Sequence, residues 1–332
     1  MTGTLIGCDS KSTPSDSAST ASSSTSISTT LASEVINFTR MPSAACSNQA
    51  PSGELTATRI EAANTTRSEP GLYEGPVWIK DALYFSDFTF SAGFPSRIQK
   101  LDSSGKMSVF MEDSGSNGIA ADAQGNLIAG THKYKSLSKY NINTGERTSV
   151  VEKFNENLFN SPNDLAITKD GVIYFTDPDY QTKAAPGGQD KTRVYRVATD
   201  GTVSVVDDTL SNPNGISLSP DEKTLYVVGN QEAGVLRKYE ILDGVPQMGV
   251  TIAEGINVPD GMAVDCAGNL YVTEHVGKQI RVYTPEGQQI ATIKVDANVT
   301  NAAFGGPENK TLFITGAGAV WKLDLAISGS AY

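Results

Sequence analysis

Oxygen-bearing side chains recur along this 332-residue chain at intervals that could bring them together around one cation. Each one stands in a short turn directly before an apolar run. The six stretches read EGPVW, NGIAAD, NDLAIT, NGISLS, DGMAVD and NAAFGG, and their lead residues are Glu74, Asn117, Asn163, Asn214, Asp260 and Asn301. Successive lead residues are 43, 46, 51, 46 and 41 positions apart. Because Ca²⁺ prefers carboxylate and amide oxygens, six such turns meeting at one place would form a site for a hard cation.

The near-constant spacing predicts repeated structural units. After each lead turn comes a short apolar strand, a second turn and a second strand, as in residues 262–265 followed by 269–273. Most units then continue with another hairpin, such as the one around residues 193–201. Four short strands in each of six units predict an all-β fold, a six-bladed β-propeller with four-stranded blades.

The propeller is expected to span residues 53–332. Its last unit lacks an outer strand, and residues 54–60 are expected to supply it, which would close the ring and remove an exposed edge. The propeller region contains no helical pattern of ordinary length and no G-x-S-x-G motif, so the sequence disfavours an α/β-hydrolase.

The first residues differ in kind from the rest. Residues 1–8 end in LIGC, which resembles the lipobox of a bacterial lipoprotein signal and makes Cys8 a candidate for lipidation. Residues 9–52 are rich in Ser and Thr and hold too little apolar surface to fold, so we expect a disordered linker. Together these features predict a lipoprotein of the bacterial cell envelope, periplasmic or surface-exposed.

Charge and cysteine content narrow the partners. The net charge is −11, from 26 basic and 37 acidic residues. This charge argues against a nucleic-acid-binding protein and against a basic protein of the membrane surface. We expect a monomer that meets a membrane only through its lipid anchor. Cys46 and Cys266 could pair in an oxidising compartment, but their contexts favour two free thiols.

The lead residues supply the candidate metal site, because the first strand of each blade lines the channel of a propeller. Glu74, Asn163, Asn214 and Asp260 offer two carboxylates and two amides, which suits Ca²⁺. Proline precedes the last three of them and restricts how their side chains point. Any one of them alone would more often be a structural turn residue. With only two histidines in the chain, a zinc or iron site is not expected.

Further residues are candidates for contact with a substrate. We assign this role to Asn117, Asn163, Asp177 and Asn301, and we expect Asp177 and Tyr180 on a loop over the channel mouth. Turn capping is the competing interpretation for the asparagines. His132 and His275 end their second strands and are expected to be structural.

The motifs EGPVW, NSPNDLAITKDGVIYFTDPDY, PNGISLSPDEKTLYV and PDGMAVDCAGNLYVTEH resemble those of the gluconolactonase, senescence-marker-protein and luciferin-regenerating-enzyme family. The resemblance runs from about residue 73 to residue 323. It implies hydrolysis of a sugar lactone with a divalent metal, Ca²⁺ or alternatively Zn²⁺ or Mn²⁺, bound by Glu74, Asn163, Asn214 and Asp260. It also implies Asp260 as the general base. Propellers similar to diisopropyl-fluorophosphatase use a similar set of ligands.

Three alternatives to sugar lactonase activity stay open at this point. The same metal could serve a phosphotriesterase or another esterase, and a propeller can also be a non-catalytic binding scaffold. An enzyme similar to strictosidine synthase is the third alternative, and it fits the motifs less well. The stretch before NSPND lacks the basic residue common in the family, and Leu158 and Phe159 there are expected to make the pocket more apolar.

Overall fold

The computed structural model of the protein describes residues 46–47, 49–230 and 233–330. The predicted lipidation site Cys8 and the linker up to residue 45 lie outside the described residues. Within the described ranges, no helix has both the length and the apolar character needed to cross a membrane.

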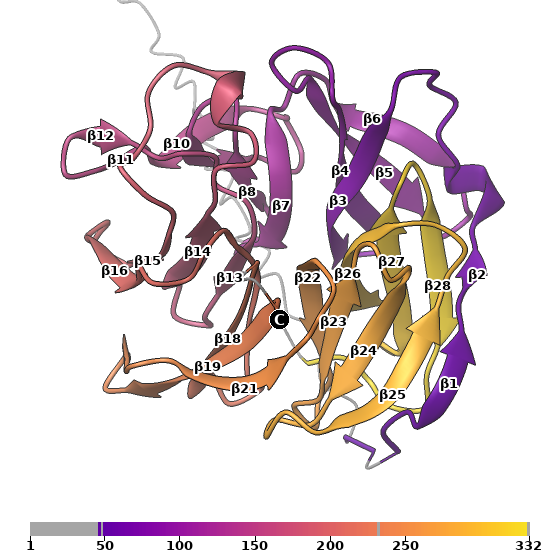
Figure 1. Ribbon diagram of the computed structural model, residues 1–332. Helices are drawn as coiled ribbons and strands as arrows, with labels where there is room; N and C mark the ends of the chain where they lie inside the picture. Colours follow the sequence, from indigo (N-terminus) through magenta and orange to yellow (C-terminus); the bar gives the residue numbers. More distant parts are fainter. Residues whose placement is uncertain (1–45, 48, 231–232, 331–332) are drawn as a thin grey trace, which may run out of the picture. The chain divides into compact units, whose positions relative to one another are not determined.

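Six antiparallel sheets, arranged as the blades of a propeller, make up the described chain, which confirms the predicted fold (Figure 1). Blade one consists of β3 (Gly71–Ile79), β4 (Ala82–Thr89), β5 (Ser96–Asp102) and β6 (Met107–Met111). Blade two consists of β7 (Ser116–Ala121), β8 (Leu127–Thr131), β9 (Ser136–Tyr140) and β10 (Arg147–Val151). Blade three consists of β13 (Leu165–Ile167), β14 (Ile173–Asp177), β15 (Arg193–Val197) and β16 (Val203–Asp207).

The second half of the ring repeats this order. Blade four consists of β17 (Pro213–Leu218), β18 (Thr224–Gly229), β19 (Val235–Leu242) and β21 (Val250–Glu254), with β20 (Val245–Pro246) extending β19. Blade five consists of β22 (Pro259–Val264), β23 (Leu270–Glu274), β24 (Gln279–Tyr283) and β25 (Gln289–Lys294). Blade six has β26 (Val299–Gly305), β27 (Thr311–Gly316) and β28 (Val320–Asp324). The small elements are β11 (Lys153–Phe154), β12 (Asn157–Leu158), η1 (Glu61–Ala63) and η2 (Thr182–Ala184).

The N-terminal strands close the ring in two places. β2 (Thr58–Arg59) pairs antiparallel with β28 and supplies the outer strand of blade six, as predicted. β1 (Gly53–Thr56) pairs instead with β25 of blade five, and this pairing is parallel. In Figure 1 the two indigo strands lie beside the yellow β25 and β28. One short segment therefore fastens two blades.

A disulfide joins Cys46 to Cys266 across 220 positions of sequence, with their Cα atoms 5.6 Å apart. The prediction of two free thiols is therefore wrong. Spacing could not reveal the pair, because β1 and β2 carry the N-terminal segment to blades five and six, where Cys266 lies. Ser47 Oγ also donates to the carbonyl of Ala326 at 2.9 Å. The residues just before Gly53, which we expected in the linker, are thus attached to the propeller.

The hydrophobic core is divided among the gaps between blades. Six clusters of buried apolar side chains occur in the described chain, and each combines residues from two neighbouring blades. Trp321 of blade six, for example, packs in one cluster with Tyr271 of blade five. No blade buries its faces alone, so the ring must be complete for the core to form.

Candidate functional site

The lead residues lie in the inner strands, at a repeated irregularity of pairing. Between Glu74 and Val77 the strand β3 advances three residues, while its partner β4 advances two. The same one-residue excess occurs in β7, β17, β22 and β26. These are β-bulges, which bend a strand and re-aim its side chains. The expectation that the lead residues lie on turns is corrected accordingly.

The third blade reaches the same geometry just ahead of β13. The N–H of Asn163 donates to the carbonyl of Thr176, and the N–H of Thr176 donates to the carbonyl of Asp164. Two residues of the inner segment therefore oppose one residue of β14. A bulge in every blade explains why the motif repeats in sequence as a lead residue followed by a small residue and an apolar run.

Glycine after a lead residue lets neighbouring blades approach at the channel. A Cβ atom on Gly261 would lie 2.0 Å from Cγ of Asn301, and one on Gly215 would lie 2.3 Å from the carbonyl oxygen of Asp260. Both distances are below any real contact, so these positions exclude every larger residue. The glycines bring the lead side chains of adjacent blades close together.

Hydroxyl groups on the second strands fix the lead residues from behind. Thr176 Oγ1 donates to the carbonyl of Asn214 at 2.7 Å, from blade three to blade four. Ser86 Oγ donates to the carbonyl of Asn117 at 2.6 Å, from blade one to blade two. Thr273 Oγ1 donates to the carbonyl of Thr300 at 2.7 Å, beside Asn301. Because these hydroxyl and carbonyl groups are buried and hydrogen-bonded, they hold the inner strands in one register.

The four predicted metal ligands are all buried. The exposed fractions of Glu74, Asn163, Asn214 and Asp260 are 4%, 4%, 6% and 8%. Burial raises the pKa of Glu74 well above its usual range, and the carboxylates of Asp260 and Asp164 raise it further. Burial also raises the pKa of Asp260, with an added effect of Asp164. Two of the predicted ligands therefore repel each other in the channel.

The donor set fits a hard cation, since two buried carboxylates and two amides leave a charge that a divalent ion would neutralise. No basic side chain is among the described groups that shift the pKa values of these two acids. Within residues 46–47, 49–230 and 233–330, no group of three or more His, Cys, Asp or Glu side chains is arranged to hold a metal. The fit thus rests on the mixed set of acids and amides, and the ligand assignment stays a prediction.

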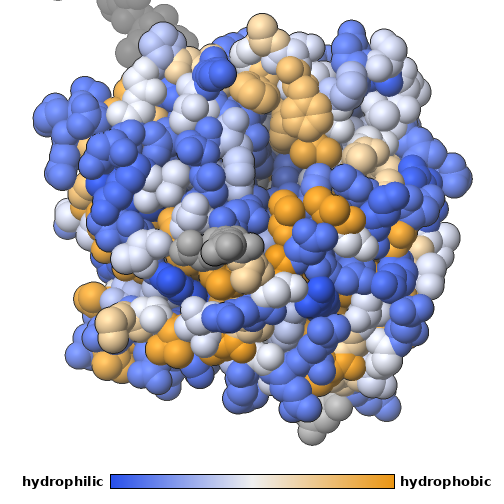
Figure 2. All heavy atoms as spheres, in the orientation of Figure 1, coloured by the Kyte–Doolittle hydropathy of each residue, from blue (hydrophilic) through white to orange (hydrophobic). Residues whose placement is uncertain are grey.

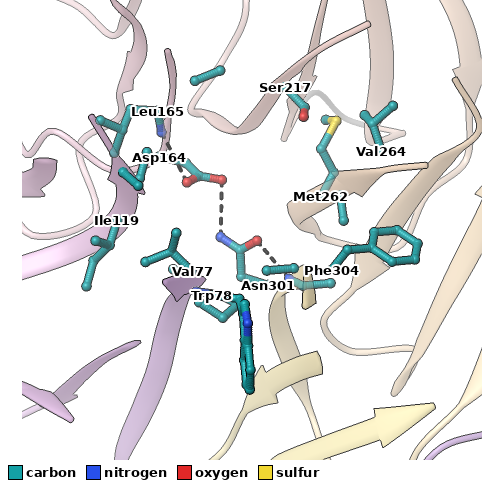
Figure 3. Close-up of a pocket in the computed structure, with 18 of the residues that line it drawn as sticks. Val77, Trp78, Ile119, Asp164, Leu165, Ser217, Met262, Val264, Asn301 and Phe304 are labelled. Carbon is teal, nitrogen blue, oxygen red and sulfur yellow. Dashed lines mark hydrogen bonds between the residues drawn. The ribbon is translucent and has the colours of Figure 1, made fainter. Parts of the chain in front are cut away.

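Asp164, which follows the predicted ligand Asn163, and Asn301, the lead residue of blade six, meet across the channel. Asn301 Nδ2 donates to Asp164 Oδ2 at 3.1 Å, and Asn301 Oδ1 accepts from the N–H of Ala302 at 2.8 Å (Figure 3). Burial raises the pKa of Asp164 to about 7. The sequence suggested Asn301 as a substrate contact, but in the structure both of its side-chain atoms are bonded within the ring.

A cavity of about 140 Å³ begins at this pair and continues down the channel. Figure 3 shows apolar side chains around it, among them Val77, Ile119, Met262 and Phe304. The four predicted ligands do not line it, although residues one or two positions after each of them do. Figure 2 shows hydrophobic residues near the hollow at the ring centre and mostly hydrophilic residues elsewhere on that face. The apolar cavity therefore adjoins the predicted metal site, since Asp164 and Asn301 line the cavity and also act on Glu74.

Asn117 is the predicted substrate contact with an unfilled bonding site. Its Nδ2 donates to Oε1 of Gln181 at 3.5 Å, a long contact. Its Oδ1 is buried without a hydrogen-bond partner among the described residues. A buried amide oxygen without a partner fits a place where a ligand or water completes the bonding.

Asp177 does not lie on a loop over the mouth, and that prediction is wrong. It is the last residue of β14 and is fully buried. Its two carboxylate oxygens accept from the N–H groups of Asn160 and Ser161, at 2.9 and 2.8 Å. Burial raises its pKa to about 7. Asp177 thus shapes the segment before Asn163.

Phe159 also differs from its expected role. It is fully buried and packs in the core against Phe175 and Tyr195, with ring centroids 5.0 and 5.2 Å away. The expectation that it makes the substrate pocket apolar is wrong, because the turn stabilised by Asp177 points it inward.

The two histidines have different surroundings. His132 is buried, and its Nε2 lies 2.8 Å from the carbonyl of Phe94, as expected of a structural residue. His275 Nδ1 lies 2.7 Å from the carbonyl of Val299 and 3.6 Å from Oδ2 of Asp260. Burial lowers the pKa of His275, which favours the neutral ring. Its proximity to Asp260 was missed, although it follows from the pairing of Pro259 with Glu274.

Tyr180 was placed near the mouth by the sequence, but its partners were not foreseen. Asn230 Nδ2 donates to the Tyr180 hydroxyl, which also lies 3.4 Å from the carbonyl of Asn212. Burial and the Asp260 carboxylate raise the pKa of Tyr180, while hydrogen bonds from Asn230 and Asn214 oppose this. The hydroxyl therefore stays protonated beside two predicted ligands.

Comparisons with known proteins agree with this architecture. Residues 72–318 match the family described as the SMP-30/Gluconolactonase/LRE-like region. A gluconolactonase of Zymomonas mobilis is 31% identical over 276 residues, covering 73% of this chain and 75% of that protein. Pentonolactonase XacC of Haloferax volcanii is 26% identical, over 78% of this chain and 92% of its own.

A solved structure gives the same result. The gluconolactonase XC5397 of Xanthomonas campestris superposes with a TM-score of 0.69 and 25% identity, covering 84% of this chain and 99% of that one. At the level of the family, the expectation of an enzyme that hydrolyses lactones is confirmed. With three quarters of its length matched by the family model, the chain belongs to the SMP-30/gluconolactonase/LRE-like family.

Proposed function

We propose that this protein hydrolyses a sugar lactone or a related cyclic ester with the help of Ca²⁺ or another divalent cation. The observation that carries the proposal is the pair of buried carboxylates, Glu74 and Asp260, which share one channel without a basic partner among the groups that shift their pKa values. Such a pair is costly to keep unless a cation compensates it. Membership of a family with lactonase relatives gives the reaction class.

Glu74, Asn163, Asn214 and Asp260 would hold the cation. When bound, a divalent ion polarises the lactone carbonyl and stabilises the negative charge that grows on its oxygen. The bulges and the hydroxyl bonds behind them keep the four side chains in place before any ligand arrives. Little of the binding energy is then spent on ordering the site.

Asp260 would accept the proton of the attacking water. The water oxygen bonds to the acyl carbon, the ring C–O bond breaks, and the leaving alkoxide takes up a proton to give the hydroxy acid. His275 Nδ1 lies 3.6 Å from Asp260 Oδ2 and bonds the carbonyl of Val299. Asn117, whose Oδ1 has no partner in the described chain, is positioned to bond a substrate hydroxyl.

We also propose that the protein acts in an oxidising compartment, such as the bacterial cell envelope. The Cys46–Cys266 disulfide supports this, because such bonds persist outside the reducing cytosol. Lipidation at Cys8 would attach it to a membrane and remains part of the proposal.

The test is hydrolysis of a panel of γ- and δ-lactones, followed with a pH indicator in the presence of Ca²⁺ or EDTA. We expect turnover that requires the metal and falls by about a hundredfold or more in Asp260→Asn. Asp243→Asn, an exposed aspartate in the β19–β20 turn, is the matched control and should keep full activity.

The remaining outcomes separate the alternatives. Calcium binding without turnover of any lactone, but with turnover of a phosphotriester, would favour phosphotriesterase activity at the same site. Calcium binding with neither activity would favour a binding scaffold. Absence of calcium binding would contradict the ligand assignment.

A further inference from the structure

The loop between β14 and β15 extends from blade three to both neighbouring blades. On one side Gln181 Oε1 lies 3.5 Å from Asn117 Nδ2 of blade two. On the other side the N–H of Asp179 donates to Asn212 Oδ1 at 2.9 Å, ahead of blade four. Tyr180 stands between these two contacts.

The loop is held in one conformation by buried bonds at its base. Ser161 Oγ donates to the carbonyl of Pro178 at 2.7 Å. Lys135, fully buried, donates from Nζ to the carbonyls of Asn160 and Thr182, at 2.6 and 3.0 Å. A buried lysine that bonds two carbonyls from different segments fixes both of them. Tyr180 is thus presented by a rigid support.

The Tyr180 hydroxyl accepts a hydrogen bond but donates only a weak one. Asn230 Nδ2 donates to its oxygen, which leaves the O–H free to donate elsewhere. The nearest backbone acceptor, the carbonyl of Asn212, lies 3.4 Å away. Hydroxyl donors normally sit about 2.7–2.8 Å from their acceptor, so this bond is weak and easily exchanged.

The surroundings of the hydroxyl point to a substrate oxygen as the better acceptor. Its neighbour Asn212 stands two residues before the predicted ligand Asn214, and both Asn214 and the Asp260 carboxylate act on the hydroxyl. Tyr180 is 36% exposed, so a ligand can reach it. A reacting ester bound at the predicted ligands would therefore lie within reach of this proton.

We propose that Tyr180 is a substrate-contacting residue whose hydroxyl, oriented by Asn230, donates a hydrogen bond to an ester oxygen of the bound lactone as negative charge develops there. The bond supplements the cation and involves no transfer of the tyrosine proton. Gln181, on the other side of the loop, does not share this role because its amide faces Asn117. This assignment rests on the proposed lactonase function.

The test compares wild-type protein with Tyr180→Phe, which removes only the hydroxyl, on a lactone that the wild type hydrolyses. At saturating Ca²⁺ we expect kcat to fall about tenfold or more while KM changes by less than about threefold. The calcium concentration that half-saturates the thermal shift should stay within about twofold of wild type. Asn230→Ala should lower kcat in the same direction but less, because the hydroxyl loses the donor that orients it.

Tyr134→Phe is the matched control, since Tyr134 lies in the turn between β8 and β9 against Arg147 and should keep full activity. An unchanged kcat in Tyr180→Phe would overturn the assignment. A loss that excess Ca²⁺ restores would also overturn it, since Tyr180 would then only support Asn214. Absence of turnover in the wild-type protein would overturn the lactonase function itself. Turnover in the wild type that is unchanged in Tyr180→Phe would overturn only the role of the tyrosine.

Discussion

Asn301 of blade six donates a hydrogen bond to Asp164 of blade three, 3.1 Å away and 137 positions earlier in the chain. The bond crosses the channel beside the predicted ligands, because the Asp164 carboxylate acts on both Glu74 and Asp260. Burial raises the pKa of Asp164 to about 7, and the hydrogen bond from the buried Asn301 amide opposes this rise. The two blades on opposite sides of the ring are thereby linked at its centre.

Asn301→Ala removes this bond and leaves a buried carboxyl group with fewer partners. We expect the free energy of unfolding to fall by about 1–3 kcal/mol, measured by urea denaturation in calcium-free buffer. Asn143→Ala, in an exposed turn, is the control and should change it by less than about 0.5 kcal/mol. Equal losses in the two variants would contradict the importance of the cross-channel bond.

Glu74→Gln should separate stability from metal binding. Without metal, the variant relieves repulsion between Glu74 and Asp260, so we expect the free energy of unfolding to rise by about 1–2 kcal/mol. With Ca²⁺, the wild type should gain stability by about 2.7 kcal/mol at a concentration one hundred times the Kd, and the variant should gain little. Glu254→Gln on the exposed edge of blade four should behave as wild type in both measurements. A variant that retains the full calcium-induced shift would remove Glu74 from the ligand set.

Asp177 gives a pH dependence of stability whose sign follows from its pKa. Burial raises this pKa from 3.8 to about 7, so between these values the folded protein binds a proton that the unfolded chain has lost. The contribution of Asp177 to the free energy of unfolding is therefore full below the unfolded pKa and is lost as the pH rises toward 7. Its upper bound is on the order of 4 kcal/mol.

The measurement is the free energy of unfolding of Asp177→Asn across that pH range. We expect a flatter decrease with rising pH than in the wild type, because asparagine does not titrate. Asp243→Asn should keep the wild-type slope. Parallel curves for wild type and Asp177→Asn would mean that Asp177 is ionised in the folded protein at all of these pH values.

Cys266→Ser opens the disulfide that ties the N-terminal segment to blade five. We expect a loss of about 2–5 kcal/mol in the free energy of unfolding, since the bond closes a loop of more than two hundred residues. Cys46→Ser should give the same loss, and a reductant should destabilise the wild type but neither variant. Insensitivity of the wild type to the reductant would show that the bond does not form in solution.

Periodicity revealed the ring because every blade obeys the same local rules. The lead residues, the tight turns and the apolar strands repeat within the spacing of one blade, so the sequence predicted the fold and the family correctly. The bulges were not foreseen, since a bulge is a property of two paired strands and the sequence shows only one strand at a time.

The features of the site that the sequence did not show share one cause, which is contact between segments distant in sequence. Asp177 follows a strand and resembles a loop residue, yet it accepts bonds from Asn160 and Ser161, which precede it by a full hairpin. Asn301 repeats the lead pattern, but its amide is bonded across the ring to Asp164. Cys46 and Cys266 are neighbours only because β1 and β2 close the ring.

Ring closure by β1 and β2 has a consequence for biosynthesis. These strands leave the ribosome before any blade has formed, yet their partners β25 and β28 belong to the last two blades of the ring to be translated. The early strands must wait unpaired through nearly the whole synthesis of the chain, and pairing across so long a separation is slow. The ring can thus close only when these early strands meet the two blades that are made after all the others.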